Sequence, residues 1–95
     1  MAAYVIGEIE VTDPAVYEEY RKRVPAVIAQ YGGRYLVRGG KVEPLEGGWT
    51  PKRLVALEFP TMEQARKWYR SPEYAPLIEL HQKAARGRLV MVEGA

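Results

Sequence analysis

The sequence has no cysteine and only one histidine among its 95 residues. Without cysteine the chain can form no disulfide and no thiolate zinc site, and it has no thiol nucleophile. A single histidine also cannot build a histidine-rich metal centre, so we expect neither a metal nor another cofactor. The hydrophobic fraction of 47% and the charged fraction of 27% are those of an ordinary globular domain, and they exclude a disordered or fibrous chain.

Long apolar runs are absent as well. No stretch approaches the roughly eighteen apolar residues of a membrane span, and the N-terminus lacks the basic start of a signal peptide. We therefore expect a cytoplasmic protein with no membrane partner. The 14 basic and 12 acidic residues give a net charge of +2, so the charge balance does not favour nucleic acid as a partner. Asparagine is missing while arginine and glutamate dominate the charges, a composition associated with thermostable proteins.

Alternating and helical hydrophobic patterns divide the chain into the elements of one domain. Residues 3–11 alternate as a strand requires. Asp13 followed by Pro14 is typical of a helix start, because the carboxylate accepts free amide protons and the first helical position needs no N–H. Apolar residues then recur every three or four positions as far as Tyr31. Pro25 lies within this helix, and its ring is predicted to bend or split it.

The rest of the chain predicts three more strands and two more helices. A Gly39-Gly40 pair ends the second strand, and the connection from there to Pro51 is unusually long for a hairpin. The strands span residues 34–38, 52–59 and 88–93, and the helices span residues 61–69 and 75–85. The order β-α-β-β-α-β is that of an α+β, ferredoxin-like domain over residues 1–95, with a four-stranded antiparallel sheet and its helices on one face.

Helices on one side cover only one face of the sheet, yet both faces carry apolar side chains. One face is predicted to hold Val5, Ile9, Val55, Leu57, Val90 and Val92. The other is predicted to hold Tyr4, Ile6, Leu36, Leu54, Ala56, Leu89 and Met91. An open apolar face of this size exceeds what soluble monomers normally expose, and a second copy packed sheet to sheet is the economical cover. We therefore predict a homodimer.

Carboxylates are expected at one end of the second face. They are Glu8, Glu10, Glu58 and Glu93, with Arg38 as a candidate fifth member. Charges that face a partner sheet need pairing or a shifted pKa. This region is therefore either a structural cluster of ion pairs or the wall of a polar cavity, and we favour the structural cluster because strand ends often carry charges that reach water.

An ordered series of motifs spans nearly the whole chain. It consists of Thr12-Asp13-Pro14 with Tyr17 and Tyr20, then Tyr31 to Gly40, Glu46-Gly47 with Trp49, Glu58-Phe59-Pro60, and Ala65 with Trp68 to Tyr74. These motifs resemble the family known as domain of unknown function 1330. The resemblance implies membership of the dimeric alpha-beta barrel superfamily, in which two ferredoxin-like chains pack sheet against sheet.

This resemblance implies no particular reaction. Relatives in the superfamily include cofactor-free monooxygenases, haem-degrading enzymes, muconolactone isomerases and ligand-sensing domains of transcriptional regulators, so the fold alone does not assign a function. The chain also departs from the family at His81, where arginine is common. That difference counts against any mechanism based on histidine.

The candidate catalytic residues are His81, Glu58 and Arg38. The pKa of an unperturbed histidine lies near neutrality, so His81 could act as a general acid or base if it faces a cleft. Its helical stripe favours the other interpretation, a histidine buried where the last helix meets the sheet. Glu58 and Arg38 would supply charged partners for a substrate.

The candidate substrate-binding residues are aromatic: Tyr69, Tyr74, Trp49 and Trp68. Buried tyrosine hydroxyls need partners, which favours Tyr69 and Tyr74 as pocket residues. The spacing of Trp68 on its helix is more typical of plain core. Trp49 lies in the long connection, where it would contact either a ligand or the second copy of the chain.

Three hypotheses about function follow. The first is a small enzyme that acts on an apolar or aromatic metabolite without metal or cofactor. The second is a ligand-binding module with the same cavity and no turnover. The third is a purely structural dimer whose charges fix the register of the two sheets. We favour the enzyme, because a half-polar sheet face is a costly way to hold two chains together.

Overall fold

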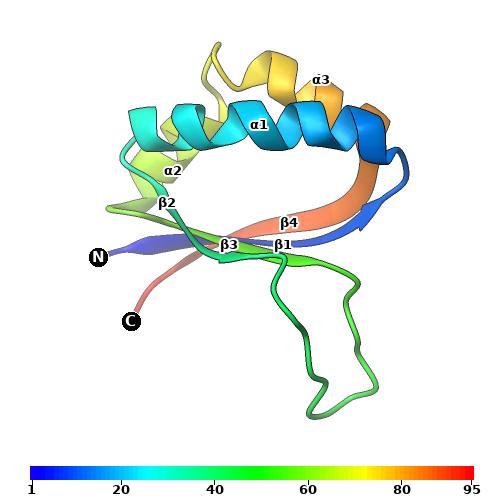
Figure 1. Cartoon of the computed structure of the whole chain (residues 1–95). Coiled ribbons are helices and arrows are strands. Elements are labelled where there is room, and N and C mark those ends of the chain that lie inside the picture. The colour runs from blue at the N-terminus through cyan, green and yellow to red at the C-terminus, as the bar shows by residue number, and fades with distance from the viewer.

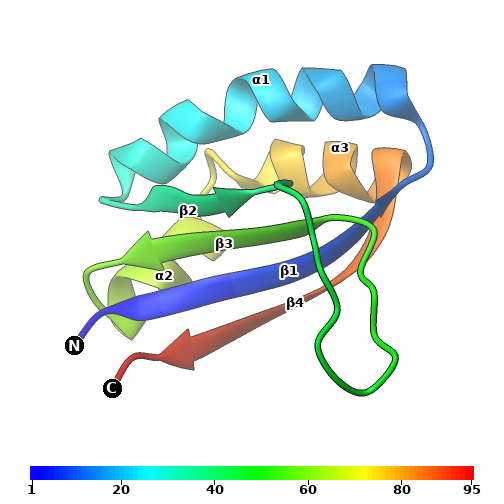
Figure 2. The ribbon, with the colours of Figure 1, turned by 60° about the horizontal axis from the view of Figure 1, so that its bottom comes forward.

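The computed structural model describes all 95 residues as a four-stranded antiparallel sheet with three helices on one side (Figure 1). The elements in chain order are β1 (Ala3–Val11), α1 (Pro14–Gln30), β2 (Arg34–Arg38), β3 (Leu54–Phe59), α2 (Met62–Tyr69), α3 (Ala75–Ala84) and β4 (Ala85–Glu93). The strands lie side by side in the order β2-β3-β1-β4 (Figure 2). The predicted ferredoxin-like α+β fold is confirmed.

The first helix begins as the sequence predicts. The Asp13 carboxylate accepts a hydrogen bond from the backbone N–H of Val16 at 3.2 Å, and Pro14 occupies the first helical position.

Pro25 does not split the helix, and α1 continues through it to Gln30. Proline removes the N–H that would bond the carbonyl of Arg21. The Arg38 guanidinium replaces that donor, with Nη2 at 2.7 Å from the Arg21 carbonyl oxygen.

The core lies between the helices and one face of the sheet. Its largest fully buried side chains are Trp68, Phe59, Ile28, Leu77, Val5 and Val24. Trp68 packs with its ring centroid 5.3 Å from that of Phe59 and 4.3 Å from that of Tyr74. Residues of α1, α2, α3 and the sheet all contribute, so the helical layer is fixed to the sheet by one continuous aromatic and aliphatic core.

The register of β4 differs from the sequence-based expectation. Tyr4 pairs with Val92 and Ile6 pairs with Val90, and directly paired residues of neighbouring strands share a face. Val90 and Val92 therefore lie on the face away from the helices, whereas Leu89 and Met91 lie on the helix side. The predicted assignment of these four residues is wrong by one position. The physical reason is that β4 begins at Ala85, directly after α3, without a turn residue to mark its start.

The same register separates Glu93 from the other carboxylates. Glu93 pairs with Ala3, whose side chain is buried on the helix side of the sheet. Glu8, Glu10 and Glu58 lie on the opposite face, which we call the outer face. The predicted cluster of four carboxylates is thus reduced to three.

A bulge in β2 changes the side of Arg38. Arg34 pairs with Glu58 on the outer face, but the register shifts between Tyr35 and Val37. An extra residue in a strand inverts the alternation that follows it. Arg38 consequently lies on the helix side, where it contacts the backbone of α1 instead of joining the carboxylates.

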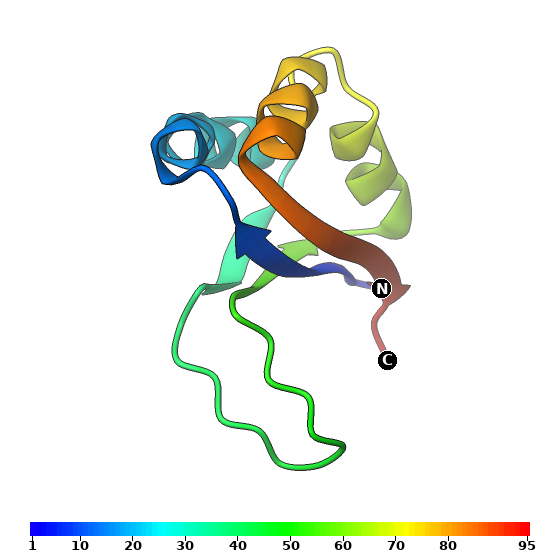
Figure 3. The same ribbon diagram turned by 90° about the vertical axis from the view of Figure 1, so that its right-hand side faces the viewer.

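No helix covers the outer face (Figure 3). Large apolar side chains are exposed on it, including Ile6 at 40%, Val90 at 60% and Val92 at 47% of their surface. The segment 39–53 between β2 and β3, which we call the arm, projects from this side of the sheet (Figures 1 and 3). Leu45 near its tip is 92% exposed. Separately, none of the three helices has the length and apolar character needed to cross a membrane.

Candidate functional site

A cavity of about 200 Å³ lies between the sheet and the helices, and we call it the inner cavity. Thirteen of its 17 lining residues are hydrophobic. α1 contributes Tyr17 and Tyr20, the α2–α3 region contributes Trp68, Tyr69 and Tyr74, and α3 contributes His81. Because all three helices lie on one face of the sheet, residues far apart in the sequence meet in this space.

Two tyrosines form the polar centre of the cavity. The hydroxyls of Tyr20 and Tyr74 are hydrogen-bonded to each other at 2.8 Å, and both side chains are buried. Burial raises the pKa of Tyr74 to about 12, and it raises the pKa of Tyr20 further still. Both phenols are therefore protonated and uncharged at neutral pH.

His81 lies beside this pair. Its ring centroid is 4.8 Å from that of Tyr20 in an edge-on arrangement and 6.0 Å from that of Tyr17. The side chain is half-buried, and desolvation lowers the pKa of His81 below its ordinary value of 6.5. The imidazole is therefore neutral at pH 7, so it can accept a proton at one nitrogen and donate one from the other.

Trp68 carries the one buried side-chain polar atom that lacks a hydrogen-bond partner. Its residue is 2% exposed, and no protein group accepts the hydrogen of Nε1. A buried donor without a partner costs about 1–3 kcal/mol, so native structures rarely contain one without a reason. Trp68 lines both the inner cavity and a smaller apolar cavity of about 190 Å³ next to β4.

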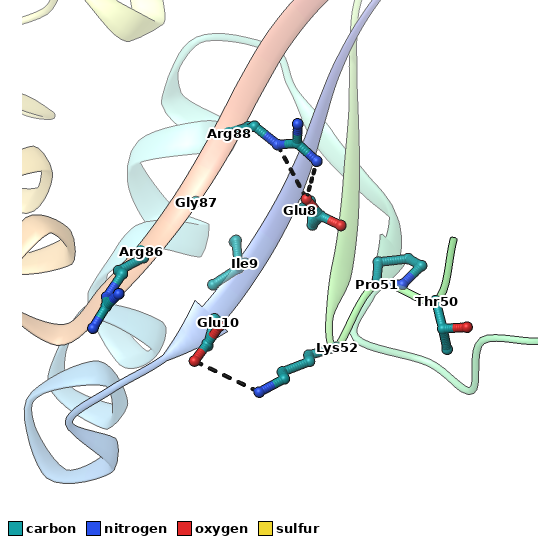
Figure 4. Close-up of a pocket in the computed structure, with 9 residues that line it drawn as sticks. All are labelled: Glu8, Ile9, Glu10, Thr50, Pro51, Lys52, Arg86, Gly87 and Arg88. Carbon is teal, nitrogen blue, oxygen red and sulfur yellow. Dashed lines mark hydrogen bonds and ion pairs between the residues drawn. The ribbon is translucent and has the colours of Figure 1, made fainter. Parts of the chain in front are cut away.

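A second, polar pocket lies where the outer face meets the arm (Figure 4). The Arg88 guanidinium donates two hydrogen bonds to Glu8 Oε1, from Nη2 at 2.6 Å and from Nε at 3.1 Å. The Trp49 indole donates to Glu8 Oε2 at 2.6 Å. These bonds, Trp49 first and Arg88 second, lower the pKa of Glu8. Lys52 pairs with Glu10 at 3.6 Å. The carboxylates here are already paired, which makes the pocket a network of ion pairs more than a reactive site.

The structure brings together four of the seven predicted site residues. His81, Trp68, Tyr69 and Tyr74 all line the inner cavity. The other three lie elsewhere, each with its own partner. Glu58 pairs with Arg34 at 2.7 Å on the outer face, Arg38 binds the backbone of α1, and Trp49 on the arm binds Glu8.

Sequence reasoning missed the residues from the first helix. Tyr17 and Tyr20 fit the apolar stripe of that helix and were indistinguishable from core aromatics, and Tyr35 on β2 gave no signal either. One signal was available. A tyrosine that lies among aliphatic residues on the buried face of an element must bury its hydroxyl. That hydroxyl then needs a polar partner in the same interior.

The element order and the sheet topology define a class: α+β proteins of ferredoxin-like fold. Within it, the chain belongs to the family described as Domain of unknown function (DUF1330), whose sequence model matches residues 2–95. A comparison with curated proteins finds no match.

Solved structures of similar fold come from several bacteria. A protein of unknown function from Rhodopseudomonas palustris is 16% identical with a TM-score of 0.80, and the match covers 99% of this chain and 82% of that one. SnoaB, a cofactor-independent oxygenase from Streptomyces nogalater, is 14% identical with a TM-score of 0.69, covering 99% and 93%. A dimeric protein of unknown function and ferredoxin-like fold from Bacteroides fragilis is 16% identical with a TM-score of 0.66, covering 98% and 96%.

Proposed function

We propose that the inner cavity binds a small apolar or aromatic molecule and that His81 acts on it as a general base or acid without a cofactor. The observation that carries this proposal is the position of a neutral, half-buried imidazole at an aromatic cavity. General acid–base groups are most effective when their pKa lies near the working pH. The pKa of His81, below 6.5, leaves the imidazole free to accept a proton.

The charge-free surroundings of His81 set the kind of step it can perform. Tyr20, whose ring packs against His81, and Tyr74 remain protonated, and their mutual hydrogen bond leaves one phenol proton free to bond an oxygen that becomes negative as a proton leaves the substrate. Proton abstraction from a carbon or hydroxyl next to such an oxygen fits this arrangement. The similarity in fold to SnoaB, which works without a cofactor, supports a reaction of this general kind.

A non-catalytic binding module is the alternative, and one observation favours it. The His81 side chain has no hydrogen-bond partner within the chain, whereas catalytic imidazoles are commonly oriented by a carboxylate or a carbonyl. In this alternative the cavity holds its ligand unchanged, and His81 contributes packing and one hydrogen bond.

Because the chain has a single histidine, its ring resonances report on the cavity without ambiguity. We expect small uncharged aromatic compounds that raise the Tm also to shift the His81 ring protons in NMR spectra. A pH titration of the same protons should give a pKa below 6.5, and turnover of any substrate should fall as the pH drops through that value. Compounds that raise the Tm but leave His81 unshifted would contradict the proposed site. Binding without turnover, unaffected by His81→Gln, would favour the module.

We also propose that the working form is a homodimer packed through its outer faces. The exposed area of 6260 Å² exceeds the roughly 5,500 Å² that size scaling gives for a monomer of this mass, an excess of roughly 760 Å². A standard interface buries about 800 Å² per partner. The Bacteroides fragilis protein of similar fold is described as dimeric, which supports this assembly. A cytoplasmic location stays part of the proposal.

A further inference from the structure

We infer that the arm of each chain binds a second copy of this chain: it passes the end of the second copy's sheet at which β1 begins, and its tip at Leu45 packs against that end. This inference rests on the proposed function, because it requires a homodimer packed through the outer faces. It adds a second contact surface to that dimer and fixes how the two copies are oriented.

The first support is that the arm is held in place at its base. The backbone N–H of Ile9 donates a hydrogen bond to the Arg53 carbonyl at 2.8 Å. The Trp49 indole donates to the Glu8 carboxylate at 2.6 Å. Both contacts lie at the end of the sheet where β2 ends and β3 begins (Figure 2), so the rest of the chain sets the direction in which the arm projects.

The second support is that the tip of the arm packs against nothing in its own chain. Residues 43–50 are all exposed, and no backbone hydrogen bond involves residues 40–48. Leu45 is 92% exposed. Pro44 restricts the backbone beside it, which lowers the entropy lost when the tip binds. Long connections in compact domains are usually binding elements, so a fixed arm with a free apolar tip fits a partner outside the chain.

The third support is the direction and reach of the arm. It projects from the outer side of the sheet, where the second copy would lie (Figures 1 and 3), yet it leaves Ile6 and Val90 40% and 60% exposed. Sheets packed face to face lie about 10 Å apart. The seven residues from Gly39 to Leu45 can span up to about 23 Å when extended. The tip can therefore pass the sheet of the second copy.

The strand register indicates which end of that sheet the arm meets. Ile6 and Val90 pair within the apolar part of the outer face. Glu8, which binds the arm, lies two residues beyond Ile6 on β1, and Tyr4 lies two residues before it. A two-fold axis across the strands at Ile6 therefore places Glu8 of each copy opposite Tyr4 of the other. Each arm then passes the end of the other sheet at which β1 begins, which we call the far end.

A two-fold axis along the strands is the alternative, and the arms themselves disfavour it. That axis would bring both arms to the same end of the dimer. Four strands at the usual spacing form a sheet only about 14 Å wide between its outermost strands. Two arms of this length would compete for the same space there, whereas the axis across the strands keeps them apart.

The far end also offers a surface that suits the tip. A hollow of about 210 Å³ lies there, lined by Ala2, Gly32, Arg34, Glu58, Phe59 and Pro60. The side chain of Arg34 is 70% exposed, so its guanidinium can pair with another carboxylate besides Glu58. The tip carries Glu43 and Glu46 on either side of Leu45. The charges of the tip and of the far end are therefore complementary.

A spin label on the tip tests where the arm lies. The chain has no cysteine, so Glu46→Cys provides a single labelling site that leaves Leu45 in place. The nitroxide-labelled variant is refolded together with isotope-labelled wild-type chain, so that broadening in the spectrum of the wild-type chain arises only between copies. We expect the amide protons of Gly32 and Arg34 to broaden most, and those of Gly87 and Arg88 at the other end to broaden least.

A pair of substitutions at Leu45 tests whether the tip contributes to the dimer. Leu45→Ser should raise the dimer dissociation constant about tenfold, the effect of losing part of one buried leucine side chain. Leu45→Met keeps an apolar side chain of similar volume and should leave the constant close to the wild-type value. Neither change should alter the Tm of the dilute monomer, because Leu45 is 92% exposed within its own chain. Sedimentation equilibrium measures the dissociation constants.

The outcomes separate this inference from the proposed dimer. A wild-type chain that stays monomeric at micromolar concentration would overturn both. A stable dimer that Leu45→Ser leaves as tight as the wild type would overturn the inference alone. So would a nitroxide that broadens Gly87 and Arg88 as much as Gly32 and Arg34, or one that broadens none of them.

Discussion

At the residue scale, Arg38 donates a hydrogen bond to the backbone carbonyl that Pro25 leaves without an N–H donor. Proline has no N–H for the carbonyl four residues earlier, so that carbonyl needs a donor from outside the helix. The Arg38 guanidinium bonds that carbonyl, at Arg21, over 2.7 Å and also lies 4.6 Å from the ring centroid of Tyr35. Arg38 was a candidate catalytic residue from the sequence, and its contacts instead give it a structural role.

This pairing can be measured as a coupling between two substitutions. Arg38→Met should destabilise the fold by about 1–2 kcal/mol, because the Arg21 carbonyl loses its donor and the cation–π contact disappears. In a Pro25→Ala background the backbone N–H at position 25 returns, so the same Arg38 substitution should cost about 0.5–1 kcal/mol less. Urea unfolding of the four proteins gives the coupling energy. An equal cost in both backgrounds would show that Arg38 does not compensate for Pro25.

At the element scale, all seven helices and strands could be predicted from the sequence. The face of the sheet on which the side chains of β2 and β4 lie could not. Helix starts have local chemistry, such as the Asp13 cap, and are therefore readable. The register of β4 depends on its pairing with β1, since Ala85 follows α3 without a turn. The bulge after Tyr35 likewise has no residue that marks it. Candidate site residues on these strands were consequently misplaced, whereas those on helices were not.

The turn from α1 into β2 shows how tightly the helical layer is held against the sheet. A Cβ added at Gly33 would lie 2.5 Å from Phe59 Cε1 and 2.8 Å from Ile28 Cγ2, closer than real Cβ contacts. Both neighbours are fully buried, so neither can move aside cheaply. The close approach of α1 to β3, which helps to shape the inner cavity, therefore requires glycine here.

Gly33→Ala should destabilise the protein by about 1–3 kcal/mol, the usual cost of overpacking a core. Gly40→Ala is the matched control, because a Cβ there has nothing within 4 Å and its φ is not positive. The control should be neutral or slightly stabilising, since alanine restricts the unfolded chain. Chemical denaturation of both variants measures the difference. A Gly33→Ala protein as stable as the control would mean that the helix and sheet are packed more loosely than the structure shows.

At the scale of the whole molecule, the chain distributes polar and apolar groups as half of an interface would. The exposed valines and isoleucine of the outer face are flanked by paired charges, Arg34 with Glu58 on one side and Arg88 with Glu8 on the other. An apolar centre with a polar rim is the usual anatomy of a protein–protein interface. The sequence predicted this face from strand alternation alone, although the β4 residues that it assigned there, Leu89 and Met91, proved to be the wrong pair.

Val90 offers a direct test of this assembly. It is 60% exposed and pairs with Ile6 on the outer face, so Val90→Asp should leave the folded chain intact but place a carboxylate in the centre of the interface. We expect the dimer dissociation constant to rise at least about 100-fold, in line with the several kcal/mol that a buried unpaired charge costs. Ala26→Asp, which adds the same charge on the exposed side of α1, should not alter it. Sedimentation equilibrium at micromolar concentration measures both. A monomeric wild-type protein, or a Val90→Asp dimer as tight as the wild type, would show that the outer face is not where two copies meet.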